Sequence, residues 1–193
     1  MQKPAQTKTP INPIIAHRWS PRVFSSQPVE EDKISALLEA ARWSSSAFNE
    51  QPWRFIVGSK NNEVWKNILD TLVEWNQQWA KTAPLLVLNI VKLTFTHNNK
   101  PNDVAEYDLG QAVATMVLEA VHQGLFAHQM TGFDSKKAAT LFHIPEGYKA
   151  VSVTAFGYYG NPEEIPADIA KLEDNKRSRR ELPELAFFDT FGK

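Results

Sequence analysis

The hydrophobic positions of this chain follow a helical period in five stretches. Apolar residues recur every three or four positions near residues 34–41, 64–73 and 107–121, which predicts three amphipathic helices. Shorter helices are expected over residues 11–19, closed by Ser20-Pro21, and over residues 135–142, stopped before Pro145. The helix over residues 107–121 is apolar on most sides, so we expect it to be buried and to end at Gly124.

Three further stretches have the apolar character of strands. Residues 85–91, opened by Pro84, are almost entirely apolar and predict a buried strand. Residues 54–57, ended by Gly58, and residues 149–159 predict two more, whereas residues 94–103 are polar and predict a loop. Strands separated by helices in this way predict an α+β fold with a small central sheet flanked by helices.

The length of 193 residues fits one domain with a substantial core. The sequence contains neither internal repeats nor a segment typical of a linker between domains. We therefore expect a single domain over residues 1–193 with a loose N-terminal arm at residues 1–10. A C-terminal arm, about residues 161–193, is polar and charged and ends in Phe187, Phe188 and Phe191. An aromatic tail after a charged segment predicts docking on a partner subunit.

Charge and composition exclude several classes of function. Lys plus Arg (21) nearly balance Asp plus Glu (22), so no overall field attracts nucleic acid or an anionic membrane. Cysteine is absent, which removes disulfides and thiolate catalysis. The N-terminal residues contain no apolar stretch of signal-peptide length, and no run has the length of a membrane helix. A cytoplasmic protein with neither a nucleic-acid nor a membrane partner is expected.

Common catalytic motifs are also missing. No Gly-x-Gly-x-x-Gly follows a strand, and neither a P-loop nor a Gly-x-Ser-x-Gly nucleophile elbow occurs. The five histidines show no spacing typical of a metal site, so no metal ligand is expected.

Two basic clusters are the first candidates for a binding site. Each contains two arginines around a serine, and guanidinium groups bind phosphate bidentately. The alternative for each cluster alone is a solvated run of charge. The clusters are Arg18-Trp19-Ser20-Pro21-Arg22 and Lys176-Arg177-Ser178-Arg179-Arg180.

Three polar segments carry further candidates. Residues 44–55 place hydroxyls and amides between a helix and a strand, which suits the edge of a flat heterocycle; the alternative is a Ser-rich turn. The amides of residues 76–78 precede the strand opened by Pro84, and they equally suit a helix surface. Residues 129–134 form a turn that exposes backbone N–H groups before a helix, and the alternative is an ordinary helix start capped by Asp134 or Ser135.

Taken in order, these elements resemble the FMN-dependent nitroreductase family. The resemblance runs from about residue 11 to the C-terminal arm. It rests on the ordered set Arg18-x-Ser20-x-Arg22, Ser45-Ser46-x-x-Asn49-x-Gln51-Pro52-Trp53, Asn76-Gln77-x-Trp79, Gly124-Leu125, Thr131-Gly132-Phe133-Asp134 and Arg177-x-Arg179.

The resemblance implies a homodimer with two FMN sites at the subunit interface and an exchanged C-terminal arm. It implies that the basic clusters hold the FMN phosphate and ribityl chain. It also implies that residues 44–55, here called the serine loop, reach the flavin from the partner subunit. Asn76 would face the pyrimidine edge of the flavin, and the turn after residue 129 would lie near flavin N5. The residues expected to bind the cofactor on this basis are Arg18, Trp19, Ser20, Arg22, Ser45, Ser46, Asn49, Asn76, Met130, Thr131, Gly132, Arg177 and Arg179.

The activity implied is two-electron, ping-pong transfer from NADH or NADPH through FMN to a small, flat acceptor such as a nitroaromatic or a quinone. The cofactor would carry the chemistry, so no catalytic side chain is expected. Two other interpretations remain open: a flavin-dependent dehydrogenase or reductive dehalogenase with a specific metabolite, and a flavin-binding protein without turnover. The chain departs from the family at Ser45, where proline is common, at Trp19, and at Trp79, where some members place a lysine near the flavin.

Overall fold

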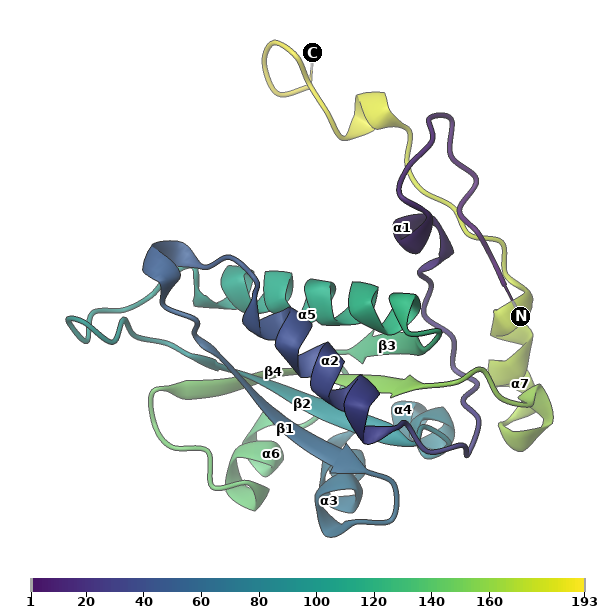
Figure 1. The fold of residues 1–193 in the computed structure, drawn as a ribbon, viewed down its shortest axis with the longest axis horizontal. Helices are drawn as coiled ribbons and strands as arrows, with labels where there is room; N and C mark the ends of the chain where they lie inside the picture. The colour runs from purple at the N-terminus through teal and green to yellow at the C-terminus, as the bar shows by residue number, and fades with distance from the viewer. Residues whose placement is uncertain (1, 193) are drawn as a thin grey trace.

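A four-stranded antiparallel sheet in the order β1-β2-β4-β3 forms the centre of the protein, which we describe from a computed structural model over residues 2–192 (Figure 1). Met1 and Lys193, the outermost residues of the two expected arms, lie outside the described residues. The strands are β1 (Trp53–Ser59), β2 (Leu85–Lys92), β3 (Phe126–Met130) and β4 (Tyr148–Gly157).

Helices cover both faces of this sheet, and short helices also lie in the N-terminal and C-terminal segments (Figure 1). The α-helices are α1 (Pro13–His17), α2 (Glu31–Arg42), α3 (Glu63–Thr71), α4 (Glu74–Ala80), α5 (Ala105–His122), α6 (Ser135–Leu141) and α7 (Ala167–Ala170). The 3-10 turns are η1 (Ala47–Asn49), η2 (Pro162–Glu164), η3 (Lys171–Asp174) and η4 (Leu182–Glu184). This α+β architecture agrees with the fold class expected from the sequence.

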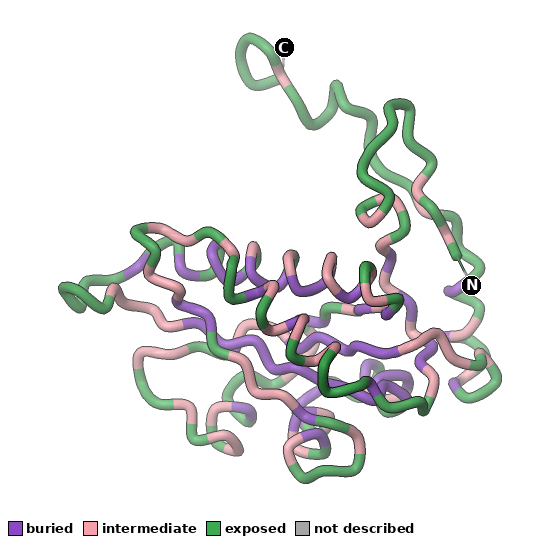
Figure 2. Tube along the Cα trace, in the orientation of Figure 1, coloured by how far each residue is buried: buried purple, intermediate pink, exposed green. Residues whose placement is uncertain are grey.

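Two hydrophobic clusters, one on each face of the sheet, hold these layers together. Alternate residues of β2 enter opposite clusters: Leu86 and Leu88 pack with α3, α4 and α6, whereas Leu85 and Val87 pack with α2 and α5. A strand covered on both sides is apolar at most positions, and the buried polar exception in β2, Asn89, donates hydrogen bonds to the hydroxyls of Ser152 and Thr154. This burial explains the continuous hydrophobic run of β2, which Figure 2 shows as buried along most of its length.

Local signals determine where several helices begin and end. Asn62 and Asp134 accept hydrogen bonds from the first backbone N–H groups of α3 and α6, so Asp134 is the cap of α6. Gly124 has φ +76°, which glycine adopts without strain, and it allows the Leu125 N–H to donate to the Ala120 carbonyl 2.8 Å away. The expected end of the long helix at Gly124 is therefore confirmed.

Three details of the sequence prediction were wrong. Strand β3 was not predicted, because the polar residues His128 and Gln129 interrupt its apolar positions and weaken the hydrophobic signal. The helix expected over residues 64–73 ends at Thr71 as α3, and a further helix that was not predicted, α4, follows the extended residues Leu72 and Val73. Gly58 lies inside β1 instead of ending it, because it lets the backbone of α3 approach closely: a Cβ there would lie 2.6 Å from the Trp65 Cα.

The two ends of the chain run side by side away from the sheet (Figure 1). The beginning of the C-terminal arm packs on its own subunit, since Ile165 and Ile169 enter the core. Beyond η4 the chain leaves the body, and Phe188 and Phe191 are fully exposed (Figure 2). Among the described residues, none of the helices is both long and apolar enough to cross a membrane.

Candidate functional site

Arg18, Arg177 and Arg179 converge at the junction of α1 with the C-terminal arm. The pKa of the half-buried Arg18 is lowered first by burial and then by the charges of Arg177 and Arg179. The pKa of Arg177 is likewise lowered by burial and by Arg179. Within residues 2–192 no carboxylate forms an ion pair with any of the three. Cations that repel one another without a protein anion are suited to bind an anionic ligand.

Arg177 also fixes the N-terminal arm. Its Nη1 donates to the carbonyl oxygens of Lys3, 2.5 Å away, and Ala16, 2.7 Å away. Lys3 in turn donates to the Asn175 carbonyl at 3.3 Å and lies 5.0 Å from the centre of the Trp19 ring. The arm therefore joins α1 to the C-terminal segment beside the arginine cluster.

The other members of the first basic motif have different surroundings. The Ser20 hydroxyl accepts a hydrogen bond from Arg18 Nη1 at 3.2 Å, so these two side chains lie together as expected for a shared anion site. The Arg22 guanidinium lies 5.2 Å from the ring centre of Trp75, an exposed residue of α4. Arg22 therefore faces α4, while Arg18 faces the C-terminal arm.

Glu173, a residue that the sequence analysis did not select, holds the Arg22 segment in place. Its Oε1 accepts a hydrogen bond from the Arg22 backbone N–H at 3.1 Å, and its side chain is buried. Burial raises the pKa of this carboxyl, opposed by the Arg22 N–H and the Arg22 charge. Burial and the charge of Glu173 raise the pKa of Tyr159 to about 12. No sequence signal distinguishes Glu173 from other acidic residues of the charged C-terminal segment.

Trp19 and His128 support the same segment from inside the protein. Trp19 is buried, with its ring edge-to-face on Phe126 at a centroid distance of 5.9 Å. His128 Nδ1 lies 2.8 Å from the Pro21 carbonyl oxygen and donates to it. Burial lowers the pKa of His128 to about 4, so the ring is neutral at pH 7.

Asn76 and Gly132 meet where α4 approaches the end of β3. Asn76 Nδ2 donates to the Gly132 carbonyl at 3.0 Å, and a Cβ on Gly132 would lie 2.7 Å from that nitrogen. A side chain at position 132 would therefore displace the Asn76 amide. The contact brings the expected pyrimidine-edge residue next to the expected turn, in which Met130 is buried and Thr131 is exposed. Because the amide N–H group is engaged, Asn76 Oδ1 is the atom suited to accept from a ligand N–H.

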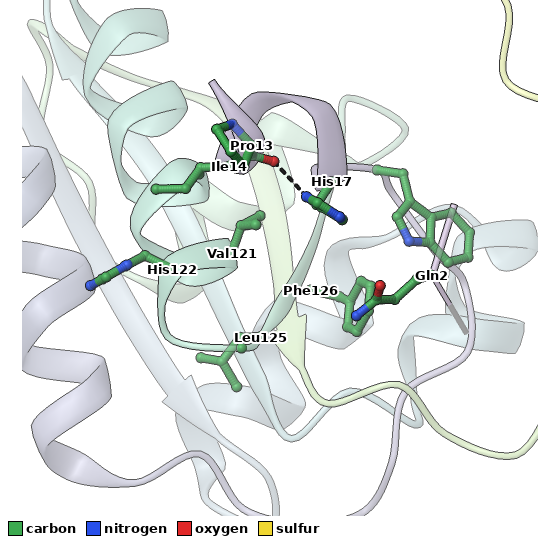
Figure 3. Close-up of a pocket in the computed structure, with 10 residues that line it drawn as sticks. Gln2, Pro13, Ile14, His17, Val121, His122, Leu125 and Phe126 are labelled. Carbon is green, nitrogen blue, oxygen red and sulfur yellow. Dashed lines mark hydrogen bonds between the residues drawn. The ribbon is translucent and has the colours of Figure 1, made fainter. Parts of the chain in front are cut away.

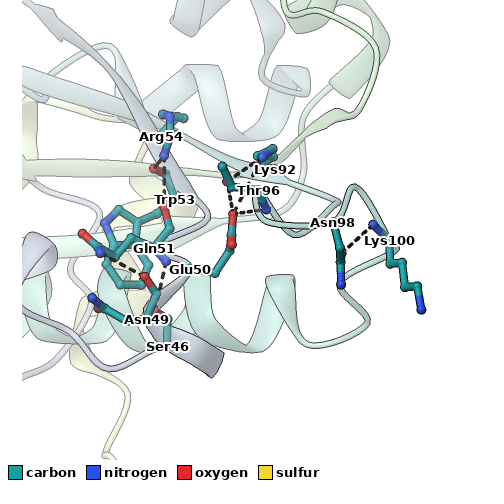
Figure 4. Close-up of polar contacts among 10 residues, drawn as sticks. All are labelled: Ser46, Asn49, Glu50, Gln51, Trp53, Arg54, Lys92, Thr96, Asn98 and Lys100. Atoms are coloured by element: carbon teal, nitrogen blue, oxygen red, sulfur yellow. Dashed lines mark hydrogen bonds and ion pairs between the residues drawn. The ribbon is translucent and has the colours of Figure 1, made fainter.

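The serine loop packs against the beginning of α5. Ser45 Oγ donates to Gln111 Oε1 at 2.9 Å, and the Ala47 N–H donates to Asp108 Oδ2 at 3.0 Å. The Ser46 hydroxyl accepts from the Gln51 N–H at 3.0 Å, so it closes the turn that carries Asn49 (Figure 4). Buried Asp108, which the sequence analysis also missed, thus holds this loop to the helix.

Backbone strain is concentrated in the same turn. Phe48, Asn49 and Gln51 have φ values of 54°, 56° and 51°, a region that L-residues rarely adopt. The turn is also tied to the loop after β2, because the Glu50 carboxylate accepts hydrogen bonds from the backbone N–H and the hydroxyl of Thr96 (Figure 4). Strained turns that are held this firmly often occur at ligand sites.

The serine loop and the arginine cluster lie at opposite ends of the long axis of the molecule (Figure 1). The loop contacts the first turns of α5 at Asp108 and Gln111, while Trp19 shares a pocket with Val121 at the other end. These helix positions are roughly 20 Å apart at 1.5 Å per residue. The structure therefore brings Arg18, Ser20, Arg177 and Arg179 together, and Asn76 with Gly132, but it leaves Ser45, Ser46 and Asn49 apart from both groups.

An open pocket of about 410 Å³ lies between α1 and the end of α5 (Figure 3). Apolar side chains such as Ile14, Val121 and Phe126 line it, and the polar residues Gln2 and His17 also contribute to its lining. Of the expected cofactor-binding residues, only Trp19 contributes to its lining.

Comparison with known proteins assigns the family. Residues 15–78 and 61–158 match the model of the Nitroreductase family. A crystal structure described as an oxidoreductase containing FMN is 32% identical, with a TM-score of 0.90 over 96% of this chain and 95% of that one. An uncharacterized 15.4 kDa protein of Mycolicibacterium smegmatis is 30% identical over 72% of this chain and 97% of its own. A putative NADH dehydrogenase/NAD(P)H nitroreductase of Archaeoglobus fulgidus is 28% identical over 75% and 83%, respectively. The chain belongs to the nitroreductase family.

Proposed function

We propose that this protein is an FMN-dependent NAD(P)H oxidoreductase that works as a homodimer and reduces flat acceptors such as nitroaromatics and quinones. The whole chain, residues 1–193, would form one FMN-binding domain. The observation that carries the proposal is the convergence of Arg18, Arg177 and Arg179 without a carboxylate partner among the described residues. A phosphomonoester carries up to two negative charges and would relieve their mutual repulsion.

The relatives support the choice of cofactor and donor. The structure that contains FMN is similar over nearly the whole of this chain, at 32% identity. The Archaeoglobus fulgidus relative bears the name of an NAD(P)H nitroreductase. We assign the same cofactor and either nicotinamide donor to this chain.

Different residues would bind different parts of FMN. Arg18 and Arg179 would bind the phosphate, with Ser20 as a neutral donor, while Arg177 contributes charge from its place beside the N-terminal arm. Asn76 Oδ1 would accept from the flavin ring, and Met130, Thr131 and Gly132 would lie along it. When bound, FMN would supply hydride transfer from NAD(P)H and then to the acceptor, so that two electrons and two protons convert a quinone to a hydroquinone.

A second subunit would complete the site. Ser45, Ser46 and Asn49 lie at the far end of α5 from the arginine cluster of their own chain, so they would serve the flavin of the partner. The exposed side of α5 suits such a pairing, because Val104 and Tyr107 are exposed and Gly110 and Ala114 leave room for close approach. The projecting aromatic residues Phe188 and Phe191 would be covered in the same dimer.

Flavin content and reduction test this proposal. Purified protein should take up one FMN per subunit, and excess NADH or NADPH should bleach the flavin absorbance under anaerobic conditions. Protein that binds FMN but is not bleached by either donor would instead be a flavin-binding protein without turnover. Protein that takes up no FMN would refute the proposal.

The phosphate assignment has its own test. The double variant Arg18→Ala/Arg179→Ala should lose FMN while the protein stays folded by circular dichroism. A control, Arg42→Ala/Arg180→Ala, removes the same charge from exposed positions outside the converging cluster and should keep FMN. Stoichiometric FMN in the first variant would contradict the assignment.

A further inference from the structure

The segment that carries the first basic motif, residues 18–22, belongs to no helix or strand. Its residues alternate between buried positions, Trp19 and Pro21, and half-buried ones, which are the two arginines and the serine. This alternation is typical of an extended chain, in which residues i, i+2 and i+4 share one side. Because no helix or ladder fixes its backbone, the segment depends on side chains from other elements for its conformation.

The local sequence fixes most of the backbone angles that precede Arg22. The ring of Pro21 sets its own φ at about −65°, and a proline also restricts the residue before it, here Ser20, to extended conformations. The angles that remain free are ψ of Pro21 and φ of Arg22, and both change when the planar peptide between these residues rotates. The orientation of that peptide therefore directs the Arg22 side chain.

Two side chains hold this peptide, one at each end. Glu173 Oε1 accepts a hydrogen bond from the Arg22 N–H at 3.1 Å, and His128 Nδ1 donates to the Pro21 carbonyl oxygen at 2.8 Å. These groups are the N–H and the C=O of one peptide unit, so the pair of side chains is here called the peptide clamp. Glu173 belongs to η3 of the C-terminal arm and His128 to β3. Rotation of the peptide would break both bonds at once.

Burial makes the peptide clamp costly to open. Glu173 is only 3% exposed, and the His128 ring packs on the fully buried Trp79 with centroids 4.5 Å apart. A buried polar group that loses its partner costs more than a typical hydrogen bond contributes, because it has left water without compensation. The clamp therefore holds the peptide in one orientation.

The peptide clamp gives Arg22 a fixed direction relative to Arg18. The Arg22 guanidinium lies 5.2 Å from the ring centre of Trp75 on α4, whereas Arg18 Nη1 donates to Ser20 beside the C-terminal arm. A ligand that spans both arginines binds more tightly when both are already in place. We propose that Glu173 and His128 are positioning residues that set the affinity for FMN by fixing the Pro21–Arg22 peptide, an inference that rests on the proposed function.

Removal of the acceptor tests the peptide clamp. Glu173→Ala should raise the FMN dissociation constant about 10-fold in a fluorescence titration, because the Arg22 N–H loses its partner and the guanidinium its fixed direction. Charge alone predicts the opposite sign, since removal of a carboxylate beside the arginines should tighten the binding of a phosphate. A purely structural role would lower the urea midpoint of the apoprotein and leave the dissociation constant unchanged.

A conservative variant and a matched control separate the hydrogen bond from the charge. Glu173→Gln keeps an oxygen that can accept from the Arg22 N–H and removes the negative charge, so it should bind FMN at least as tightly as the wild type. Asp174→Asn removes the same charge from the next residue, which is exposed, and it should not weaken binding.

The other end of the peptide clamp provides a second pair of variants, which decides the question if Glu173→Ala does not fold. His128→Leu removes the donor and should also raise the FMN dissociation constant about 10-fold. His128→Asn carries an amide N–H group in place of Nδ1 and should bind FMN more tightly than His128→Leu. Because both bonds hold one peptide, the double variant Glu173→Ala/His128→Leu should lose less than the product of the two single effects.

Wild-type uptake of FMN decides the proposed binding function, and the peptide clamp is then measured by binding alone, whether or not NAD(P)H reduces the flavin. Two results would overturn the clamp and leave the proposed function intact. One is a folded Glu173→Ala or His128→Leu variant with unchanged or tighter FMN binding. The other is a Glu173→Gln variant that binds as weakly as Glu173→Ala. A wild-type protein that takes up no FMN would refute the proposed function and the clamp together.

Discussion

The rings of Trp79 and His128 lie against each other in the core, with centroids 4.5 Å apart and an angle of 40° between them. Trp79 is fully buried. It occupies the position at which some nitroreductases are expected to place a lysine near the flavin. In this chain the residue instead supports His128, which donates to the carbonyl of Pro21 in the segment that carries Arg18 and Arg22. We therefore expect Trp79 to influence the cofactor only through that segment.

The burial of His128 predicts a loss of stability in mild acid. Its pKa is lowered to about 4 in the folded protein from the ordinary histidine value of 6.5. Between these values the unfolded chain binds the proton and the folded chain does not, so the free energy of unfolding decreases as pH falls from 6.5 toward 4. The full effect is about 3 kcal/mol, and it is absent above pH 6.5.

Urea unfolding at a series of pH values measures this dependence. His128→Gln removes the titrating group and should flatten the curve over that window, although it lowers stability at pH 7. His122→Gln, at an exposed position, should retain the wild-type slope. An unchanged slope in His128→Gln would contradict the prediction.

Gly132→Ala should weaken cofactor binding more than it weakens the fold. The added methyl group would lie 2.7 Å from Asn76 Nδ2 and 3.1 Å from Val73 Cγ2, so the Asn76 amide must move. We expect about a 10-fold rise in the FMN dissociation constant, the factor that about 1.4 kcal/mol of lost hydrogen bonding gives. Fluorescence titration with free FMN measures the constant, and an unchanged value would argue against a role of this turn in binding.

Gly58→Ala should destabilise the protein without a direct effect on the cofactor. Its Cβ would lie 2.6 Å from two backbone atoms of Trp65, neither of which can rotate away. Overpacking of this kind costs about 3 kcal/mol. The urea midpoint at a fixed protein concentration measures the loss.

Glu50→Ala should loosen the two loops that carry Phe48 and Phe95. The carboxylate accepts from the Thr96 N–H, and a hydrogen bond to a charged group in a partly buried site contributes about 2 kcal/mol. The Thr96 amide should therefore exchange with solvent at least about 10-fold faster, as followed by NMR hydrogen exchange. Glu106→Ala removes an exposed ion pair with Lys149 and should leave that rate unchanged.

The strongest parts of the sequence prediction rested on local periodicity. Strand β2 is covered on both faces and helix α5 along one, so most of their buried positions are apolar and their pattern was clear. Strand β3 was not predicted from the sequence, because its pairing with β4, and not its own composition, makes it a strand. Gly58 was interpreted as a strand end because the approach of Trp65, which requires a residue without Cβ, depends on how α3 packs.

For the candidate site, the sequence by itself determined which residue types were present: two clusters of arginines around a serine, a serine-rich loop, and amides near a Gly-containing turn. The side-chain chemistry and the local spacing of these residues follow directly from the sequence, and they were sufficient to identify the family resemblance. Only the tertiary structure decided that Arg18 meets Arg177 and Arg179 across about 160 residues, that Asn76 bonds to Gly132, and that the serine loop lies far from both. Such long-range neighbours depend on how the sheet, α5 and the C-terminal arm pack together, which no local pattern encodes.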